Sequence, residues 1–208
     1  MSSSTAELDD ATRVLVQLSA AIAASDEATV RYWLGEADRA VPPVHVEELL
    51  LQSYLFCGFP RALNATREWR RVSQRLAPDS DEAEDVALAD EWRLRGEQTC
   101  ALVYGSMYER LRLNVRDLHP ALDTWMVVDG YGKVLGRPGL DLQRRELCIV
   151  AACAAMGQDR QLHSHLRGAL NVGVEPAALR DALEAVGGLI GAQRLRSAHL
   201  LLARVLGK

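Results

Sequence analysis

The sequence lacks the excess of positive charge that would suit a polyanionic partner. Its 208 residues carry 24 Lys and Arg against 28 Asp and Glu, which gives a formal net charge of −4. Nucleic acids and anionic lipid surfaces are bound through clustered positive charge. We therefore expect neither nucleic acid nor a membrane surface to be a partner of this chain.

Long hydrophobic runs and framework cysteines are also missing. The longest apolar run, residues 147–157, is about half of the roughly 20 residues that a membrane-spanning helix needs. Residues 14–23 resemble the core of a signal peptide, but acidic residues precede them where such a peptide is positively charged. Four cysteines lie without disulfide-framework spacing: Cys57, Cys100, Cys148 and Cys153. These features predict a cytoplasmic protein with free thiols.

Metal-ligand spacing is absent as well. His163 and His165 are two residues apart, which on a helix turns them to different faces. Three further histidines have no ligand partner at metal spacing: His45, His119 and His199. The sequence predicts no metal site and implies no cofactor.

Apolar residues recur at helical spacing along nearly the whole chain. No stretch alternates in the manner of a strand, so the pattern predicts an all-α protein. Four prolines fit the first turn of a following helix: Pro43, Pro60, Pro120 and Pro176. The helices expected lie near residues 6–24, 26–39, 44–57, 60–76, 84–115 with an interruption at Gly105, 119–128, 141–156, 159–172, 176–188 and 190–206.

Residues 11–65 align with residues 144–198 without a gap, at an offset of 133. Only nine of the 55 aligned positions are identical, but residues at the turns coincide, such as Gly58 with Gly191. This favours two related four-helix halves, although unrelated four-helix segments could also align to this extent. The domains expected are a degenerate first repeat (1–77), an acidic linker (78–85) and a second repeat with an N-terminal arm (86–208).

Two motifs in the second half resemble a known family. They read Arg137-Pro-Gly-Leu-Asp141 followed by Arg-Glu-Leu, and Gln161-Leu-x-x-His165-Leu-x-Gly168-Ala-Leu-Asn-x-Gly173-Val. They are similar to the carboxymuconolactone decarboxylase family, which includes the alkylhydroperoxidase D-like peroxidases. The upstream run Val103-Tyr-Gly-x-x-Tyr108-Glu-Arg resembles the arm of the decarboxylase branch. The resemblance implies an alkylhydroperoxidase D-like helical bundle and a homo-oligomer, with a homotrimer favoured for a chain of two halves.

Glu146 and His165 fall on consecutive helices joined by a short turn near residues 157–159. Such helices run antiparallel in contact, and the two residues then differ in height by about one helical turn. A carboxylate beside an imidazole fixes its tautomer, which suits an acid–base group that works near neutral pH. We predict a proton relay here; a structural contact at a helix seam is the alternative.

The peroxidase branch of the family has a Cys-x-x-Cys pair just before the matching histidine. Here the residues four and seven positions before His165 are Gln161 and Gln158, so neither can form a thiolate. Cys148 and Cys153 lie one helix earlier, at a spacing that turns them to different faces. The departure favours the decarboxylase-type branch, whose lyase chemistry protonates carbon after carbon dioxide is lost.

That chemistry implies a proton donor, His165, oriented by Glu146, and an anchor for a substrate carboxylate, for which we favour Arg145. At the aligned positions the first half carries Arg13 and Tyr32, so it cannot form the same relay. It keeps a Gly-Phe-Pro element instead, and we expect it to wall the pocket beside His165 through three residues: Tyr54, Phe56 and Cys57.

The function expected is cofactor-independent acid–base catalysis on a small carboxylated or lactone-like molecule. Two alternatives stay open. One is an alkylhydroperoxidase-like antioxidant enzyme, which the glutamines disfavour. The other is a non-catalytic oligomeric binding or scaffold protein of the same fold.

Overall fold

The computed structural model describes residues 8–207, which fold as an all-α protein without a strand in that range. No helix in the same range is both long and apolar enough to cross a bilayer. The helices in chain order are α1 (Asp10–Ala24), α2 (Glu27–Ala40), α3 (Pro43–Cys57), α4 (Phe59–Ser73), η1 (Glu82–Glu84), η2 (Val86–Leu88), α5 (Ala89–Tyr104), η3 (Gly105–Met107), α6 (Tyr108–Leu118), α7 (Pro120–Trp125), η4 (Met126–Leu135), α8 (Leu142–Met156), α9 (Asp159–Asn171), α10 (Pro176–Ala185), α11 (Gly187–Ile190) and α12 (Ala192–Val205).

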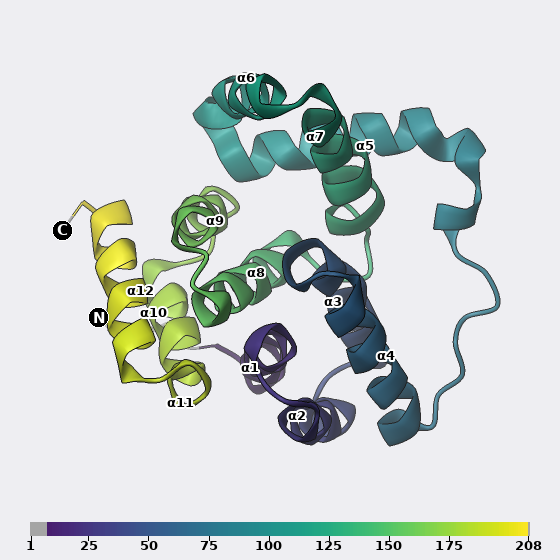
Figure 1. Cartoon of the computed structure of the whole chain (residues 1–208), viewed down its shortest axis with the longest axis vertical. Coiled ribbons are helices and arrows are strands. Elements are labelled where there is room, and N and C mark those ends of the chain that lie inside the picture. The colour runs from purple at the N-terminus through teal and green to yellow at the C-terminus, as the bar shows by residue number, and fades with distance from the viewer. Residues whose placement is uncertain (1–7, 208) are drawn as a thin grey trace, which may run out of the picture.

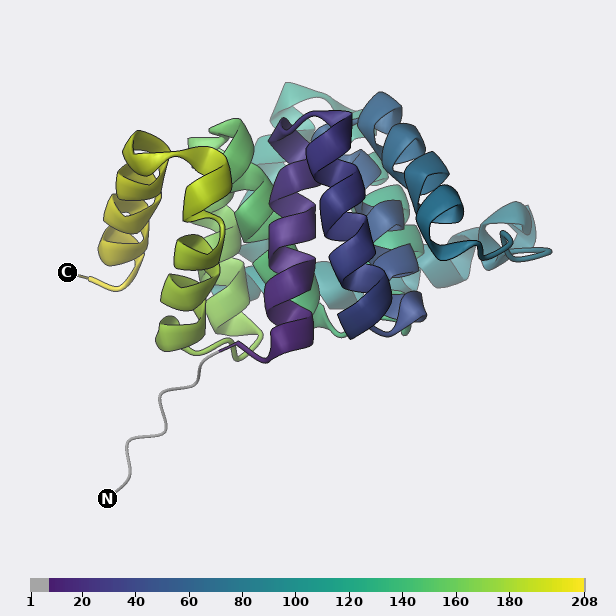
Figure 2. The same ribbon diagram turned by 90° about the horizontal axis from the view of Figure 1, so that it is seen from below.

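Helices α1 and α8 lie against each other in the middle of the molecule (Figures 1 and 2). The buried hydroxyl of Ser19 on α1 donates to the main-chain oxygen of Cys148 on α8 at 2.7 Å. One apolar core gathers α1 to α4, and a second gathers α8 to α12 with α5 and η4. The two cores meet where α1 packs on α8, so the halves bury one continuous interior.

Aspartates begin the first helix of each half. Asp9 accepts the main-chain N–H of Thr12 at 2.8 Å, and Asp141 accepts that of Arg144 at 2.9 Å. Each bond satisfies a donor that the first turn of a helix leaves free. Arg144 also pairs with Asp9 at 2.9 Å, so the starts of α1 and α8 are held together.

The helix bounds of the two halves correspond, but with a gap that the ungapped alignment misses. The offset is 132 residues at the starts of α1/α8 and α2/α9, and 133 at the starts of α3/α10 and α4/α12. The difference arises because residues 172–175 form a longer connection than residues 41–42. Val14 and Trp33, rather than Arg13 and Tyr32, therefore occupy the first-half positions of Glu146 and His165.

Two ion pairs repeat across the contact between the halves. Arg145 on α8 pairs with Glu48 on α3 at 2.7 Å, and Arg13 on α1 pairs with Asp181 on α10 at 2.7 Å. In each pair an arginine from the first helix of one half meets a carboxylate from the third helix of the other. The duplication stays a prediction, and this exchange of partners supports it.

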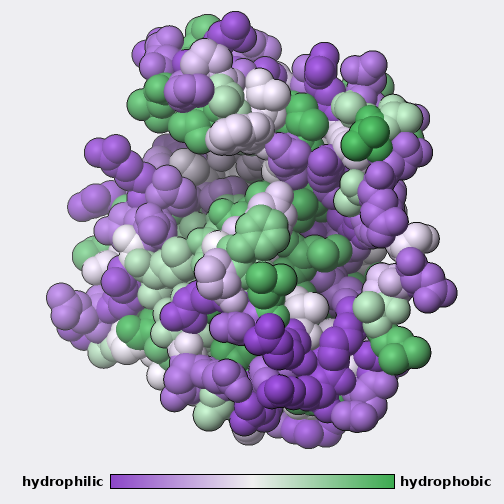
Figure 3. Space-filling model, turned by 45° about the vertical axis from the view of Figure 1, so that its right-hand side comes forward, coloured by the Kyte–Doolittle hydropathy of each residue, from purple (hydrophilic) through white to green (hydrophobic). Residues whose placement is uncertain are grey.

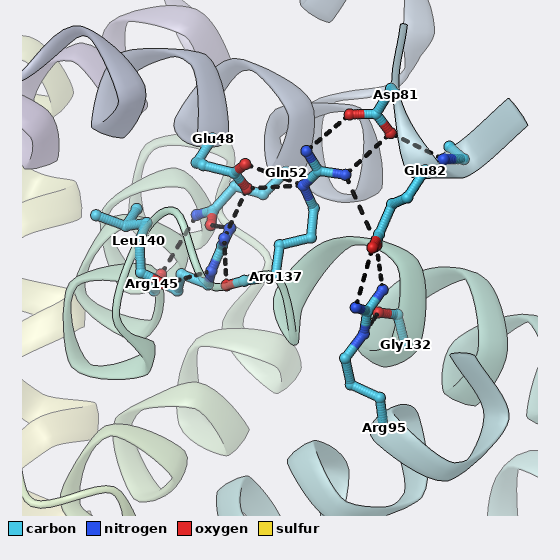
Figure 4. A network of polar contacts seen from close by, with 10 residues as sticks. Glu48, Gln52, Asp81, Glu82, Arg95, Gly132, Arg137, Leu140 and Arg145 are labelled. Carbon is cyan, nitrogen blue, oxygen red and sulfur yellow. Dashed lines mark hydrogen bonds and ion pairs between the residues drawn. The ribbon is translucent and has the colours of Figure 1, made fainter. Parts of the chain in front are cut away.

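The acidic segment 78–85 is not a free tether. Arg137 donates to both carboxylate oxygens of Asp81, at 3.0 and 2.8 Å, and its Nε donates to Glu48 (Figure 4). Glu82 forms an ion pair with Arg95 of α5. Hydrogen bonds from Arg137 hold the pKa of Asp81 below its usual value. The segment is therefore tied to the body of the molecule by these contacts.

The interruption expected at Gly105 is confirmed, because that residue has φ +52° and ends α5. The helix expected near 119–128 is too short, because the chain continues as the π-helix η4 to Leu135. This π-helix packs closely along α5 and carries one wall of the pocket described next.

Candidate functional site

A pocket of about 490 Å³ opens beside α9. Its walls come from the end of α3, the end of α5, the α7–η4 segment and α9. Figure 3 shows a hollow beneath the upper lobe of the surface, with apolar side chains gathered along its lower edge. The residues that line the pocket are Tyr54, Leu55, Phe56, Tyr104, Leu122, Trp125, Met126, Asp129, Gly130, Tyr131, Leu135 and His165. Its size and mostly apolar lining are those of a small-molecule site.

Glu146 contacts His165, which lines this pocket. Nδ1 of His165 lies 2.9 Å from Oε2 of Glu146, with the carboxylate fully buried and the imidazole only 5% exposed. A carboxylate can only accept, so Nδ1 of His165 carries a hydrogen and its N–H donates a hydrogen bond to Oε2 of Glu146. Nε2 is then the basic nitrogen left to meet a molecule in the pocket. The predicted contact is present; the catalytic role of the pair stays a prediction.

Gly168 of α9 makes room for the Glu146 carboxylate. A Cβ atom at position 168 would lie 2.8 Å from Oε2 of Glu146 and 2.6 Å from a methyl group of Val103. The other oxygen, Oε1, is buried without a hydrogen-bond partner in residues 8–207. His165 is therefore the partner that holds this carboxylate in place, and Gly168 allows the close approach.

Aromatic rings surround the imidazole. Phe56 meets His165 edge-on with ring centroids 5.4 Å apart, and Tyr104 does so at 6.5 Å. Tyr131 packs against Tyr104 at 6.1 Å. Burial raises the pKa of Tyr104 and of Tyr131 well above the usual value for tyrosine. Tyrosine is protonated near neutral pH with or without this shift, and both residues line the pocket, so a Tyr104 or Tyr131 hydroxyl can donate to an oxygen of a bound molecule.

Tyr54 and Phe56 lie where the sequence predicted them, in the pocket wall contributed by the first half. Cys57 does not line the pocket, although it follows Phe56 directly. Its side chain is instead packed with the core of the first half, because Cys57 ends α3 on the side away from the pocket lining. The prediction that Tyr54 and Phe56 line the pocket is confirmed, and the prediction for Cys57 is wrong.

Arg145 is also a correction, because it cannot reach a substrate carboxylate. Its side chain is 0% exposed and donates to Glu48, to Gln52 and to two main-chain oxygens (Figure 4). Burial lowers the pKa of Arg145 from its usual value, while the bond and charge of Glu48 act in the opposite direction. The residue next to Glu146 in sequence points away from the pocket, since neighbours on a helix face different sides.

Nine of the twelve lining residues were not predicted from the sequence as site residues, and four of the nine are aromatic or charged: Tyr104, Trp125, Asp129 and Tyr131. One carried a signal, because Tyr104 lies in the run that resembles the arm of the decarboxylase branch. Trp125 and Asp129 carried none. Trp125 ends α7, within the helix expected near 119–128, whereas Asp129 lies on η4, whose extent the sequence pattern did not indicate.

The thiols lie outside the pocket. Burial raises the pKa of Cys57 to about 11 and those of the other three cysteines to about 12. Gln158 and Gln161 line a separate hollow of about 220 Å³ on the far side of Phe56, together with Cys153. Residues 8–207 contain no group of three or more His, Cys, Asp or Glu that could hold a metal ion.

We expect iodoacetamide at neutral pH to alkylate native protein slowly, and at Cys57 first. Cys57 is the partly exposed cysteine, and a thiol with a pKa of about 11 is ionised only about one part in ten thousand at pH 7. Mass spectrometry should find four labels after urea unfolding, and Cys57→Ser should remove the slow native label. Rapid labelling of Cys153 in the native protein would contradict the burial and the raised pKa of that thiol.

Comparison with known proteins bears on this site. The sequence pattern of the carboxymuconolactone decarboxylase family matches residues 122–204, which include the pocket wall of η4, Glu146 and His165. Residues 122–204 are similar to this family, and they make up about two fifths of the chain. The match agrees with the all-α fold, and the Glu146–His165 contact lies inside the matched segment.

Two curated proteins that are similar to this chain carry different names. "Peroxisomal protein 2" of Schizosaccharomyces pombe is 31% identical over 139 residues, which cover 66% of this chain and 64% of the relative. "4-carboxymuconolactone decarboxylase" of Acinetobacter baylyi is 30% identical over 70 residues, which cover 34% of this chain and 52% of the relative. The chain thus spans less than two thirds of either relative.

Proposed function

We propose that this chain is a cofactor-independent acid–base catalyst that moves a proton at a carbon atom of a small lactone-like molecule. The observation that carries the proposal is the 2.9 Å contact between the fully buried Glu146 and His165, which lines a pocket of about 490 Å³. One relative is a decarboxylase by name, which supports chemistry of this kind.

The proposed step begins with neutral His165. Nε2 takes a proton from the carbon beside the lactone carbonyl, so the C–H bond breaks and an N–H bond forms. The electron pair moves into the conjugated carbonyl, whose oxygen the Tyr104 or Tyr131 hydroxyl can stabilise. Glu146 stabilises the imidazolium, which then returns its proton to another carbon of the same molecule. No electrons leave the substrate, so the step needs no oxidant or reductant.

The two alternatives receive less support. A thiol peroxidase needs an ionisable thiol beside His165, and the four cysteines lie outside the pocket with raised pKa values. A binding or scaffold protein would need no buried carboxylate behind the imidazole, since burying one costs free energy that only a partner offsets. The cytoplasmic location stays a prediction, and one relative is named as peroxisomal.

The test is turnover of a panel of lactones and carboxylated lactones by the wild type, His165→Ala and Glu146→Gln. We expect each variant to lose about 100-fold or more of the activity, the lower end of what a positioned acid–base group contributes. Far-ultraviolet circular dichroism should show unchanged helicity. Activity that survives in both variants, or that no protein of the set shows, would contradict the proposal.

We also propose a homotrimer. No residue of α6 is buried within the chain, and Leu113 and Leu118 of that helix are 58% and 77% exposed. Contact between copies would cover such apolar side chains. Light scattering should give three times the 22.9 kDa of one chain, and a stable monomer would contradict the assembly.

A further inference from the structure

The pocket lining includes a carboxylate but no arginine or lysine. Asp129 and His165 are its ionisable side chains apart from tyrosines, and no Lys or Arg of residues 8–207 lines it. Behind His165 lies the Glu146 carboxylate. An anionic ligand would therefore find no guanidinium or ammonium group within the pocket to replace the water it loses.

The charge of Asp129 acts inside the pocket. Burial, and next the charge of Asp129, raise the pKa of Tyr54 on the opposite wall. Asp129 has one ion-pair partner, Lys133, at 3.4 Å. The ammonium of Lys133 lies over the Trp92 ring, 4.2 Å from its centroid, and Lys133 is not part of the lining. A carboxylate bound near Tyr54 would meet the same repulsion.

An uncharged ring compound suits this lining better than an anion does. Most of the lining is apolar, and Phe56, Trp125 and Tyr104 offer ring faces and edges for packing. Tyr104 and Tyr131 line the pocket, and a tyrosine hydroxyl is a donor for a carbonyl oxygen. We infer that the pocket selects uncharged, ring-shaped carbonyl compounds such as lactones and discriminates against their carboxylated forms. This inference rests on the proposed function and names the substrate class of the same site.

The consequence for the reaction is a choice between two steps. Loss of carbon dioxide requires a substrate that carries a carboxylate, whereas migration of a proton within a lactone does not. Selection of the uncharged form therefore assigns the chain to proton migration, in which a carbon–carbon double bond changes position and the atoms of substrate and product are the same.

The test is isothermal titration calorimetry of the full chain with a matched pair, coumarin and coumarin carboxylate. We expect coumarin to bind at least about tenfold more tightly, because only the carboxylate is desolvated without a counter-ion and repelled by Asp129. Asp129→Asn should raise the affinity for the carboxylate several-fold and leave coumarin within about twofold. Asp117→Asn, which removes the same charge from the exposed face of α6, should change neither.

A pocket-filling variant ties the binding to this site. A Cβ atom at Gly130 would meet only a main-chain oxygen of Trp125, at 3.7 Å, so Gly130→Leu adds bulk to the lining without a backbone clash. Coumarin binding should be lost in Gly130→Leu with the helicity retained. Equal or tighter binding of the carboxylate, no saturable binding of coumarin, or binding unaffected by Gly130→Leu would each overturn the inference.

The inference and the proposed function fail in different experiments. If coumarin is preferred but no turnover depends on His165, the proposed function alone is contradicted. If turnover depends on His165 but coumarin carboxylate binds as tightly as coumarin, this inference alone is contradicted.

Discussion

Glu48→Ala should lower the free energy of unfolding by about 3–5 kcal/mol, the cost of leaving a buried charge without its partner. Glu48 is 5% exposed and accepts from Arg145 at 2.7 Å and from Arg137 at 2.9 and 3.1 Å. Its removal leaves the fully buried Arg145 guanidinium with neutral acceptors only. Urea denaturation followed by circular dichroism measures the change.

A matched control for Glu48→Ala is Glu27→Ala. Glu27 also pairs with an arginine, Arg31, but its side chain is 59% exposed. Exposed ion pairs contribute between zero and about 1 kcal/mol, so Glu27→Ala should change the free energy of unfolding by no more than that. Equal effects of the two substitutions would contradict the account of the buried network in Figure 4.

Gly96→Ala and Gly132→Ala should each lower the free energy of unfolding by about 3 kcal/mol, the upper end of the usual cost of overpacking. A Cβ atom at Gly96 of α5 would lie 2.0 Å from the main-chain oxygen of Val127. One at Gly132 of η4 would lie 2.1 Å from that of Trp92. Backbone cannot rotate aside as a side chain can, so α5 and η4 would have to separate.

Separation of α5 and η4 would also reach the pocket, because η4 supplies Asp129 and Tyr131 and α5 supplies Tyr104. We therefore expect both variants to bind coumarin more weakly as well. The control is Gly188→Ala, since a Cβ atom there meets nothing within 4 Å. It should leave stability unchanged or raise it by up to about 1 kcal/mol. Wild-type stability of Gly96→Ala and Gly132→Ala would contradict the close approach of the α5 and η4 backbones at these glycines.

The sequence predicts most helices because their ends carry local chemistry. Aspartate caps and prolines in first turns begin several of them, and Gly58, Gly105 and Gly157 adopt positive φ angles at their ends. The Glu146–His165 contact was likewise predictable, because a short turn between two helices leaves little freedom in how they pair. Both predictions rest on residues near one another along the chain.

The parts that the sequence did not predict depend on distant contacts. Glycines in residues 126–136 indicate the end of a helix when read alone, but Gly132 is needed for the approach to α5 and the helix continues as η4. Arg145 was favoured as a substrate anchor because it adjoins Glu146. Its actual partner, Glu48, lies 97 positions earlier in the sequence, and no local pattern indicates that pairing.

The most direct test of the proposed proton transfer is the incorporation of solvent deuterium into α-angelica lactone, a neutral butenolide, in heavy water. Nuclear magnetic resonance should show wild-type protein exchanging the protons beside the carbonyl, with His165→Ala slower by about 100-fold or more at equal helicity. Exchange at the wild-type rate in His165→Ala, or no exchange above the uncatalysed rate in the wild type, would contradict the account.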